Sequence, residues 1–208
     1  MKHINTYILS KIKNETNIVE KLRISKKITT HTLFPKSRPE LIDMIQEETK
    51  KNGNNCSLNH IDVSSIESMA FLFSEANTKF NGDISEWDVS NVRDMTALFL
   101  DSHFNGDISE WNVSNVDQMS FMFQDSKFNG DISLWDVSNV RLMTEMFERS
   151  EFNQPIGRWN TTNVEDTTFM FCDSKFNQDI SQWSLTKCNT TGMLNNCPIK
   201  NAYKPKLV

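Results

Sequence analysis

All five tryptophans of the chain stand 24 residues apart, at Trp87, Trp111, Trp135, Trp159 and Trp183. A fixed period in this range is typical of one structural unit stacked on copies of itself. Such a stack uses its large apolar residues to join neighbouring units, which excludes most enzyme folds. The repeat therefore directs the search for function to a surface rather than to a buried pocket.

The repeated unit reads Ile-x-x-Trp-x-Val-x-x-Val-x-x-Met-x-x-(Leu/Met)-Phe, followed by a turn and then Phe-Asn. Its clearest copy holds Ile84, Trp87, Val89, Val92, Met95, Leu98, Phe99, Phe104 and Asn105. An earlier copy has Ile61 in place of the tryptophan, 26 residues before Trp87. We therefore expect a two-residue insertion in the turn 75–79, because turns absorb changes of length. The pattern weakens after Trp183.

Each unit combines two periods. Trp87 and Val89 alternate, which predicts a short strand, and residues 92–99 carry apolar side chains at helical spacing. Ser90 lies between them as a candidate helix N-cap. The sequence thus predicts an α/β solenoid, a leucine-rich-repeat-like stack of about five to six 24-residue coils. We expect the tryptophans to be buried between coils and the asparagine of each Phe-Asn pair to bond backbone groups of adjacent coils.

The strings at 87–92 and 135–140 are both Trp-Asp-Val-Ser-Asn-Val. With the Met, Met-Phe and Phe-Asn-x-Asp-Ile-Ser positions that follow, the repeat resembles the BspA-type leucine-rich repeat family over about residues 61–197. The resemblance implies a repeat solenoid of a kind found in surface proteins and adhesins. It implies no catalytic residues. Members usually carry an export signal, and the chain departs from them there.

The first part of the chain differs in composition from the repeat. Residues 1–59 hold 11 Lys and Arg against 6 Asp and Glu, whereas residues 60–185 hold 7 against 21. Ser37 to Glu40 resembles a capping box with proline in the first turn, which predicts a helix over 37–52 that ends near Gly53. An open stack needs its first core layer covered, so we interpret 1–59 as a helical N-terminal region and cap, 60–197 as the solenoid and 198–208 as a C-terminal tail.

The apolar stripe from Ile4 to Leu22 predicts a further helix. It could belong to the cap, dock a partner or bind lipid as an amphipathic helix. Because Ser10, Lys11 and Lys13 interrupt the apolar residues, the N-terminus does not read as a signal peptide, and no run is long enough to span a membrane. We therefore expect a cytoplasmic protein.

The residues that most often carry chemistry form no motif. The four cysteines lack zinc-knuckle spacing, and we expect reduced thiols, with a Cys172–Cys197 bridge conceivable only in an oxidising compartment. The four histidines are scattered, and no phosphate-binding loop or nucleophile motif occurs. Regularly spaced aspartates such as Asp83 and Asp107 are interpreted as turn caps rather than calcium ligands. The sequence predicts no catalytic residue, no metal site and no cofactor.

Positions that differ between otherwise matching copies are the candidate partner-binding residues. Two outer positions flank each tryptophan, and we expect their side chains to face outward: Glu86, Asp88, Glu110, Asn112, Leu134, Asp136 and Arg158. A position in the expected helix alternates between aromatic and smaller or polar residues, and its aromatic members are Phe71, Phe121 and Phe169.

These patterns favour a non-catalytic protein-binding scaffold that acts through the outer surface of a repeat solenoid. Its partner is a protein, and a basic protein is one candidate. The alternatives are an acidic inhibitor or nucleic-acid mimic of a basic protein, such as an anti-defence protein of viral or mobile-element origin, or a surface adhesin. Direct nucleic-acid binding is disfavoured, because phosphates require a basic surface.

Overall fold

The computed structural model describes residues 30–74 and 77–206. The described residues from His31 onward form one compact unit. The expected helix between Ile4 and Leu22 lies outside the described residues, and so do two residues of the expected insertion in the turn 75–79.

Helix α2 (Arg38–Asn52) confirms the helix that the sequence predicts. Ser37 is its N-cap, and the Ser37 hydroxyl accepts the backbone N–H of Glu40. The reciprocal bond of a capping box is displaced by one residue, because the Glu40 carboxylate accepts the N–H of Lys36, at 2.6 Å. At the other end Gly53 has φ 84°, a conformation that glycine adopts without steric cost.

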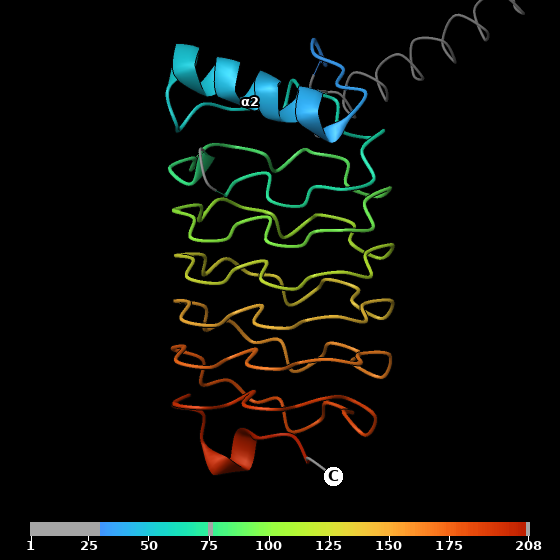
Figure 1. Ribbon diagram of the computed structural model, residues 1–208, viewed down its shortest axis with the longest axis vertical. Helices are drawn as coiled ribbons and strands as arrows, with labels where there is room; N and C mark the ends of the chain where they lie inside the picture. Colours follow the sequence, from blue (N-terminus) through green and yellow to red (C-terminus); the bar gives the residue numbers. More distant parts are fainter. Residues whose placement is uncertain (1–29, 75–76, 207–208) are drawn as a thin grey trace, which may run out of the picture. The chain divides into compact units, whose positions relative to one another are not determined.

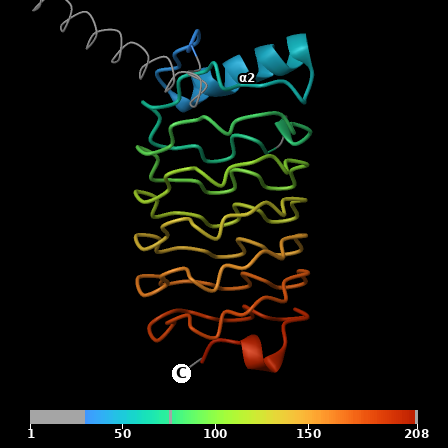
Figure 2. The same cartoon turned by 180° about the vertical axis from the view of Figure 1, so that it is seen from behind.

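The buried side of α2 covers the first coil of the stack (Figures 1 and 2). Leu41 and Ile45 are fully buried and belong to the same core as Ile61 and the coils that follow. The segment before α2 also contributes, since Leu33 forms a parallel bridge with Ile61. Helix α2 therefore covers the apolar side chains of the first coil, and the short extended segment around Leu33 pairs with the backbone of that coil.

Successive 24-residue units follow one another as stacked coils (Figure 1). One column of parallel bridges links six coils of the described chain, through Ser68, Asp94, Gln118, Leu142, Asp166 and Asn189. The expected strand at Trp87–Val89 and the expected helix over 92–99 do not form; the regular elements within the described ranges are α2 and the 3₁₀ helix η2 (Asn201–Tyr203). The assignment of the stack to leucine-rich-repeat-like α/β solenoids stays a prediction.

The backbone of each coil is a series of turns because its N–H groups alternate between two kinds of acceptor. The N–H groups of Ala97 and Phe99 donate to carbonyls of the next coil, whereas that of Leu98 donates to Met95 of its own coil. Ala97 has φ 53°, as expected for the third residue of a type II turn. An α-helix would direct every one of these groups along its own axis, and the contacts between coils would be lost.

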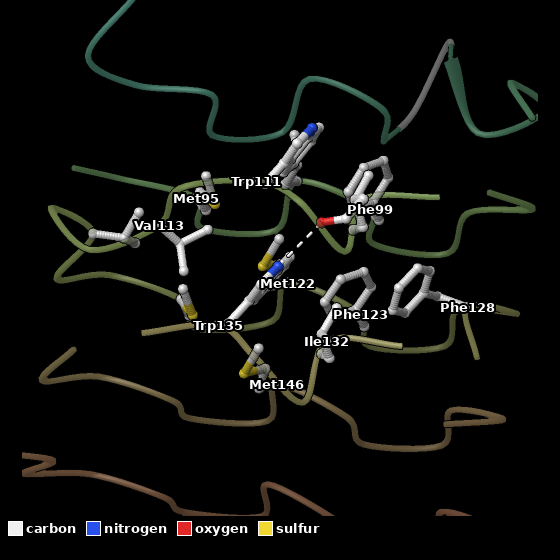
Figure 3. Close-up of a cluster of buried hydrophobic side chains, with 14 of the residues drawn as sticks. Met95, Phe99, Trp111, Val113, Met122, Phe123, Phe128, Ile132, Trp135 and Met146 are labelled. Carbon is white, nitrogen blue, oxygen red and sulfur yellow. Dashed lines mark hydrogen bonds between the residues drawn. The ribbon is translucent and has the colours of Figure 1, made fainter. Parts of the chain in front are cut away.

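The aromatic side chains stack in columns through the core. Trp135 is 4 % exposed, and its Nε1 donates to the Ile108 carbonyl of the preceding coil, at 3.1 Å (Figure 3). Phe99 and Phe123 stack with ring centroids 5.5 Å apart and planes 9° apart. The prediction that the tryptophans are buried between coils is confirmed.

Two columns of asparagine side chains bond the coils along the surface. The N–H of Asn105 donates to Asn81 Oδ1 at 2.8 Å, and the same bond recurs at each following Phe-Asn pair. This confirms the expected role of that asparagine. The second column was not predicted from the sequence; in it, Asn115 Nδ2 donates to the Ser90 carbonyl of the preceding coil at 2.7 Å.

The segment expected as a C-terminal tail covers the last coil. Ile199 is buried, and the Tyr203 carbonyl of η2 accepts the N–H of Ile180 at 3.0 Å. The Lys200 N–H continues the asparagine column by donating to Asn177 Oδ1. Both ends of the stack in the described residues are therefore closed by non-repeating chain.

Replacing Trp135 by alanine should destabilise the fold by about 3–5 kcal/mol, because it leaves a cavity between two coils. Trp135→Phe is the matched control, because it retains a ring in the column and loses the bond to Ile108. It should lower the free energy of unfolding by about 1–2 kcal/mol. Denaturant unfolding followed by circular dichroism measures both. A loss below about 1 kcal/mol for Trp135→Ala would contradict the burial of this column.

Deleting residues 1–55 should cause aggregation or end-to-end association, since it uncovers Ile61 and the unpaired backbone of the first coil. Deleting residues 1–29 alone is the control and should leave a monodisperse protein, because α2 and Leu33 stay in place. Light scattering after size-exclusion chromatography measures both. A folded, monomeric 56–208 fragment would show that α2 is not required as a cap.

Candidate functional site

The outer column lies one residue before each tryptophan. In the copy at 84–87, buried Ile84 and Trp87 anchor the segment on either side of Glu86, so the Glu86 side chain points to solvent. All members of this column are exposed: Glu86, Glu110, Leu134, Arg158 and Gln182. The structure thus places four of the candidate binding residues in one line along the stack.

The residues just after the tryptophans are also exposed, but in four of the five coils their side chains are engaged in turns. Asp136 Oδ1 accepts the N–H of Ser138 at 3.0 Å, and hydrogen bonds from Ser138 hold the pKa of Asp136 below its usual range. Asp88, Asn112 and Asn160 make the same bond to the N–H two residues on. The expectation that Ser90 caps a helix with its hydroxyl is wrong. Instead, the Ser90 N–H donates to the Asp88 carboxylate.

A second set of aspartates caps the turn that precedes every tryptophan except Trp159. Asp107, Asp131 and Asp179 each accept the N–H of the residue two positions on, at 2.9–3.0 Å. The pKa of Asp131 is lowered by the backbone N–H and the hydroxyl of Ser133. These bonds agree with the interpretation of the aspartates as turn caps. Among the residues that the structure describes, no three His, Cys, Asp or Glu side chains lie together as metal ligands would.

These positions together form a strongly acidic surface, which we call the outer face. It consists of five equivalent segments, 83–88, 107–112, 131–136, 155–160 and 179–184. They carry eight carboxylates and a single base, Arg158. Arg158 makes no ion pair with any residue of the described ranges. The outer face is thus an array of carboxylates interrupted at one point by a positive charge.

A shallow depression of about 380 Å³ lies at that interruption. Leu134, Pro155 and Arg158 line it from two adjacent coils, together with Gly157 and, from the following coil, Asp179. Leu134 is 77 % exposed, the highest value among the large apolar side chains in the described part of the chain. The structure therefore brings the apolar and the basic member of the outer column together.

The candidate aromatic column belongs to turns and not to a helix. Phe71, Phe121 and Phe169 have φ values of 52–62°, in the left-handed region. A Cβ at Gly192, the equivalent residue of the next coil, would lie 2.2 Å from the Phe169 ring, so that ring already covers the glycine. Ala97, which follows Phe71 in the column, is 1 % exposed. The small residues of this column thus leave room for an aromatic ring of the adjacent coil, as Gly192 does for Phe169. Phe71 itself remains 45 % exposed.

The structure also shows a polar cluster that the sequence analysis missed. Gln124 donates to the carboxylates of Glu145 and Glu148. Arg149 binds the Asp125 carboxylate through two nitrogens, each at 2.7 Å. Burial and the neighbouring Glu148 raise the pKa of Glu145. In the sequence this cluster is marked by opposite charges 24 residues apart, as in Asp125 and Arg149.

The four cysteines, all within the described residues, are free thiols. Cys172 is buried, with 8 % of its surface exposed. Burial is the main cause that raises the pKa of Cys172 to about 11, and the neighbouring Asp173 adds to it. The thiolate is therefore scarce near neutral pH. Burial likewise raises the pKa of Cys56, Cys188 and Cys197. None has the environment of a reactive cysteine.

The chain matches the protein family described as "Mycoplasma protein of unknown function, DUF285" over residues 40–149 and again over residues 104–204. The chain belongs to this family. The two overlapping matches agree with the internal repetition of the sequence. Comparisons with curated proteins and with solved structures gave no match. No helix in the described ranges has the length and apolar character needed to cross a membrane.

Asp136→Ala should lower the free energy of unfolding at pH 7 by about 0.5–1.5 kcal/mol, through loss of the bonds from Ser138. Asp136→Asn is the matched variant, since Asn112 makes the same bond, and it should have a smaller effect. Because the folded pKa of Asp136 is lowered, the contribution of its charge is complete above the unfolded value of about 3.9 and is lost as the pH falls through the folded pKa. Denaturant unfolding at pH 7 and at low pH measures this. Equal losses for both variants would contradict the role of Asp136 as an acceptor.

Proposed function

We propose that this chain is a non-catalytic protein-binding scaffold, and that its outer face binds a partner protein with a basic surface. The observation that carries the proposal is the concentration of eight carboxylates against one base on five equivalent, exposed segments. The large apolar side chains of the repeat are used in the core, where they join coil to coil. Six of the eight carboxylates also accept a turn N–H. Because the neutral Asn112 makes the same bond, the turns alone do not require a negative charge.

The arrangement of the carboxylates supports binding to a protein. Their backbone is anchored on both sides by buried residues, so a partner does not have to order a flexible loop, and the entropic cost of binding is reduced. Hydrogen bonds lower the pKa values of Asp131, Asp136 and Asp179, which keeps these groups ionised under mildly acidic conditions. Equivalent groups on adjacent coils repeat at about 4.8 Å, the spacing of paired chains. Such an array attracts a basic surface and speeds its association.

We further propose that the stack is a leucine-rich-repeat-like solenoid of the BspA type. The repeated Trp-Asp-Val-Ser-Asn-Val strings at 87–92 and 135–140 support this assignment. The parallel bridges between coils are compatible with it. The turns observed at 95–102 mean that such a coil would carry no helix on that side.

A second candidate function is mimicry of nucleic acid, in which the outer face occupies a groove that normally binds phosphates. The regular repetition of exposed carboxylates along the stack favours this alternative. The two functions differ in what competes for the partner. Duplex DNA or RNA should displace a mimic from its partner, because both occupy the same groove. It should not displace a scaffold that binds a different surface of the partner.

Replacing Glu86, Asp88, Glu110 and Asp136 by their amides should preserve folding and weaken partner binding. The amides at 88 and 136 retain their acceptor oxygen, as Asn112 shows. Affinity capture from cells of the source, with quantitative mass spectrometry, should show basic proteins retained by the original chain, released by salt and lost with this variant.

The control removes four charges from other columns, with Glu67→Gln, Asp101→Asn, Asp117→Asn and Glu151→Gln. It should retain the same partners, because its net charge changes equally while the outer face stays intact. If the outer-face variant keeps its partners with the same salt dependence, the outer face is not the binding site. Phe71, Phe121 and Phe169 would then be tested next.

A further inference from the structure

The coil that contains residues 155–160 departs from its neighbours at the turn before the tryptophan. Pro155 stands where the adjacent coils have aspartate, and Gly157 stands where they have serine. The backbone N–H of Gly157 has no acceptor within the described chain. This coil therefore leaves unbonded a backbone donor that the other coils bond with their own side chains.

The equivalent donor is occupied in every other coil of the described stack. In four of them the acceptor is an aspartate carboxylate, which bonds the N–H at 2.9–3.0 Å: Asp83 to Ser85, Asp107 to Ser109, Asp131 to Ser133 and Asp179 to Ser181. In the first coil Ser57 Oγ bonds Asn59 N at 3.3 Å. The fold thus shows repeatedly that this turn accommodates a carboxylate, and at Gly157 the chain does not supply one.

The surroundings of Gly157 fit the same chemistry. Arg158, the single base of the outer face, follows it directly and makes no ion pair or hydrogen bond with a described residue. A guanidinium next to a backbone N–H is a favourable site for a carboxylate. Leu134 and Pro155 line the same depression and offer an apolar surface beside these donors. A ligand that fits must carry a carboxylate next to an apolar group.

We propose that this depression binds the C-terminal residue of a peptide. The terminal carboxylate accepts the Gly157 N–H and pairs with Arg158, and the terminal apolar side chain packs on Leu134 and Pro155. This inference deepens the proposed protein-binding function by assigning to the partner an exposed C-terminus with a large apolar last residue. Backbone capture of a terminal carboxylate is a known mode of peptide recognition.

The size and charge of the site favour a chain terminus over an internal acidic segment. The depression involves three adjacent coils, about 10 Å, which is the reach of roughly three extended residues. The outer face around it is acidic, so it repels ligands with several carboxylates and favours a basic peptide with a single carboxylate at its end. Asp179 lines the same depression and opposes the incoming charge, which Arg158 must offset.

The test uses the ¹⁵N-labelled 208-residue chain and the probe peptide N-acetyl-Lys-Lys-Leu with a free C-terminal carboxylate. Titration should shift the amide resonances of Gly157 and Arg158 and saturate. The same peptide as its C-terminal amide should bind about tenfold more weakly, because the charged acceptor is removed. N-acetyl-Lys-Asp-Leu-amide, which carries its carboxylate on a side chain, should also bind more weakly than the free acid.

Three variants locate the binding site. Pro155→Asp restores the aspartate of the other coils, whose carboxylate should bond the Gly157 N–H and block the peptide. Arg158→Gln should weaken binding of the free-acid peptide by about tenfold and leave binding of the C-terminal amide almost unchanged. Asp179→Asn, which retains the turn acceptor for Ser181, should tighten binding of the free acid because it removes a competing charge.

Equal affinity for acid and amide, or unchanged binding by Pro155→Asp, would overturn the proposal. Equal binding of the side-chain carboxylate would overturn the choice of a chain terminus. The variant with amides at 86, 88, 110 and 136 keeps the depression and should still show the Gly157 shift with the free acid. Failure of the acidic outer face to bind a basic protein is thereby distinguished from failure of this site.

Discussion

The structure depends on the contact of each coil with an almost identical coil 24 residues away. The same side chain meets its own equivalent at each level, so rings stack on rings, as Phe99 does on Phe123 with planes 9° apart. Asparagine bonds asparagine along the surface, and every second N–H in the turns donates to the next coil. One coil alone would lack partners for all these groups and could not offset the entropy lost on ordering it. Closure of the ends by α2 and by residues 199–203 follows from the same requirement.

This mode of packing separates the residues that hold the stack from the residues that vary. Ile84 and Trp87 are buried in their column, whereas Glu86 between them is exposed, and this arrangement repeats in each coil. A change at an outer position alters charge or shape without disturbing the core. The outer face can therefore change from carboxylates to Leu134 and Arg158 within one column while the backbone beneath continues its pattern.

The turn bonded by a side-chain oxygen is the local unit from which the outer face is built. Where aspartate is present, it satisfies a backbone N–H and remains ionised, so one residue contributes both to the turn and to the acidic surface. Where Pro155 and Gly157 replace that unit, the carboxylate is lost and the donor has no acceptor among the described residues. A substitution of two residues thus converts a self-contained turn into a place with the chemistry to accept an external carboxylate.

The sequence by itself determined the period, the buried set, the asparagine column and α2, because each of these is set by the residue types at fixed spacings. It did not determine the path of the backbone between Met95 and Ser102. Apolar residues at helical spacing show which side chains face inward, but they do not show which carbonyl each N–H will reach. In the folded chain half of those carbonyls belong to the next coil, so turns with positive φ replace the expected helix. The same reason explains why Cys172 is buried and why Leu134, Pro155 and Arg158 share one depression: their neighbours come from other coils, and only the stacked structure brings those neighbours into contact.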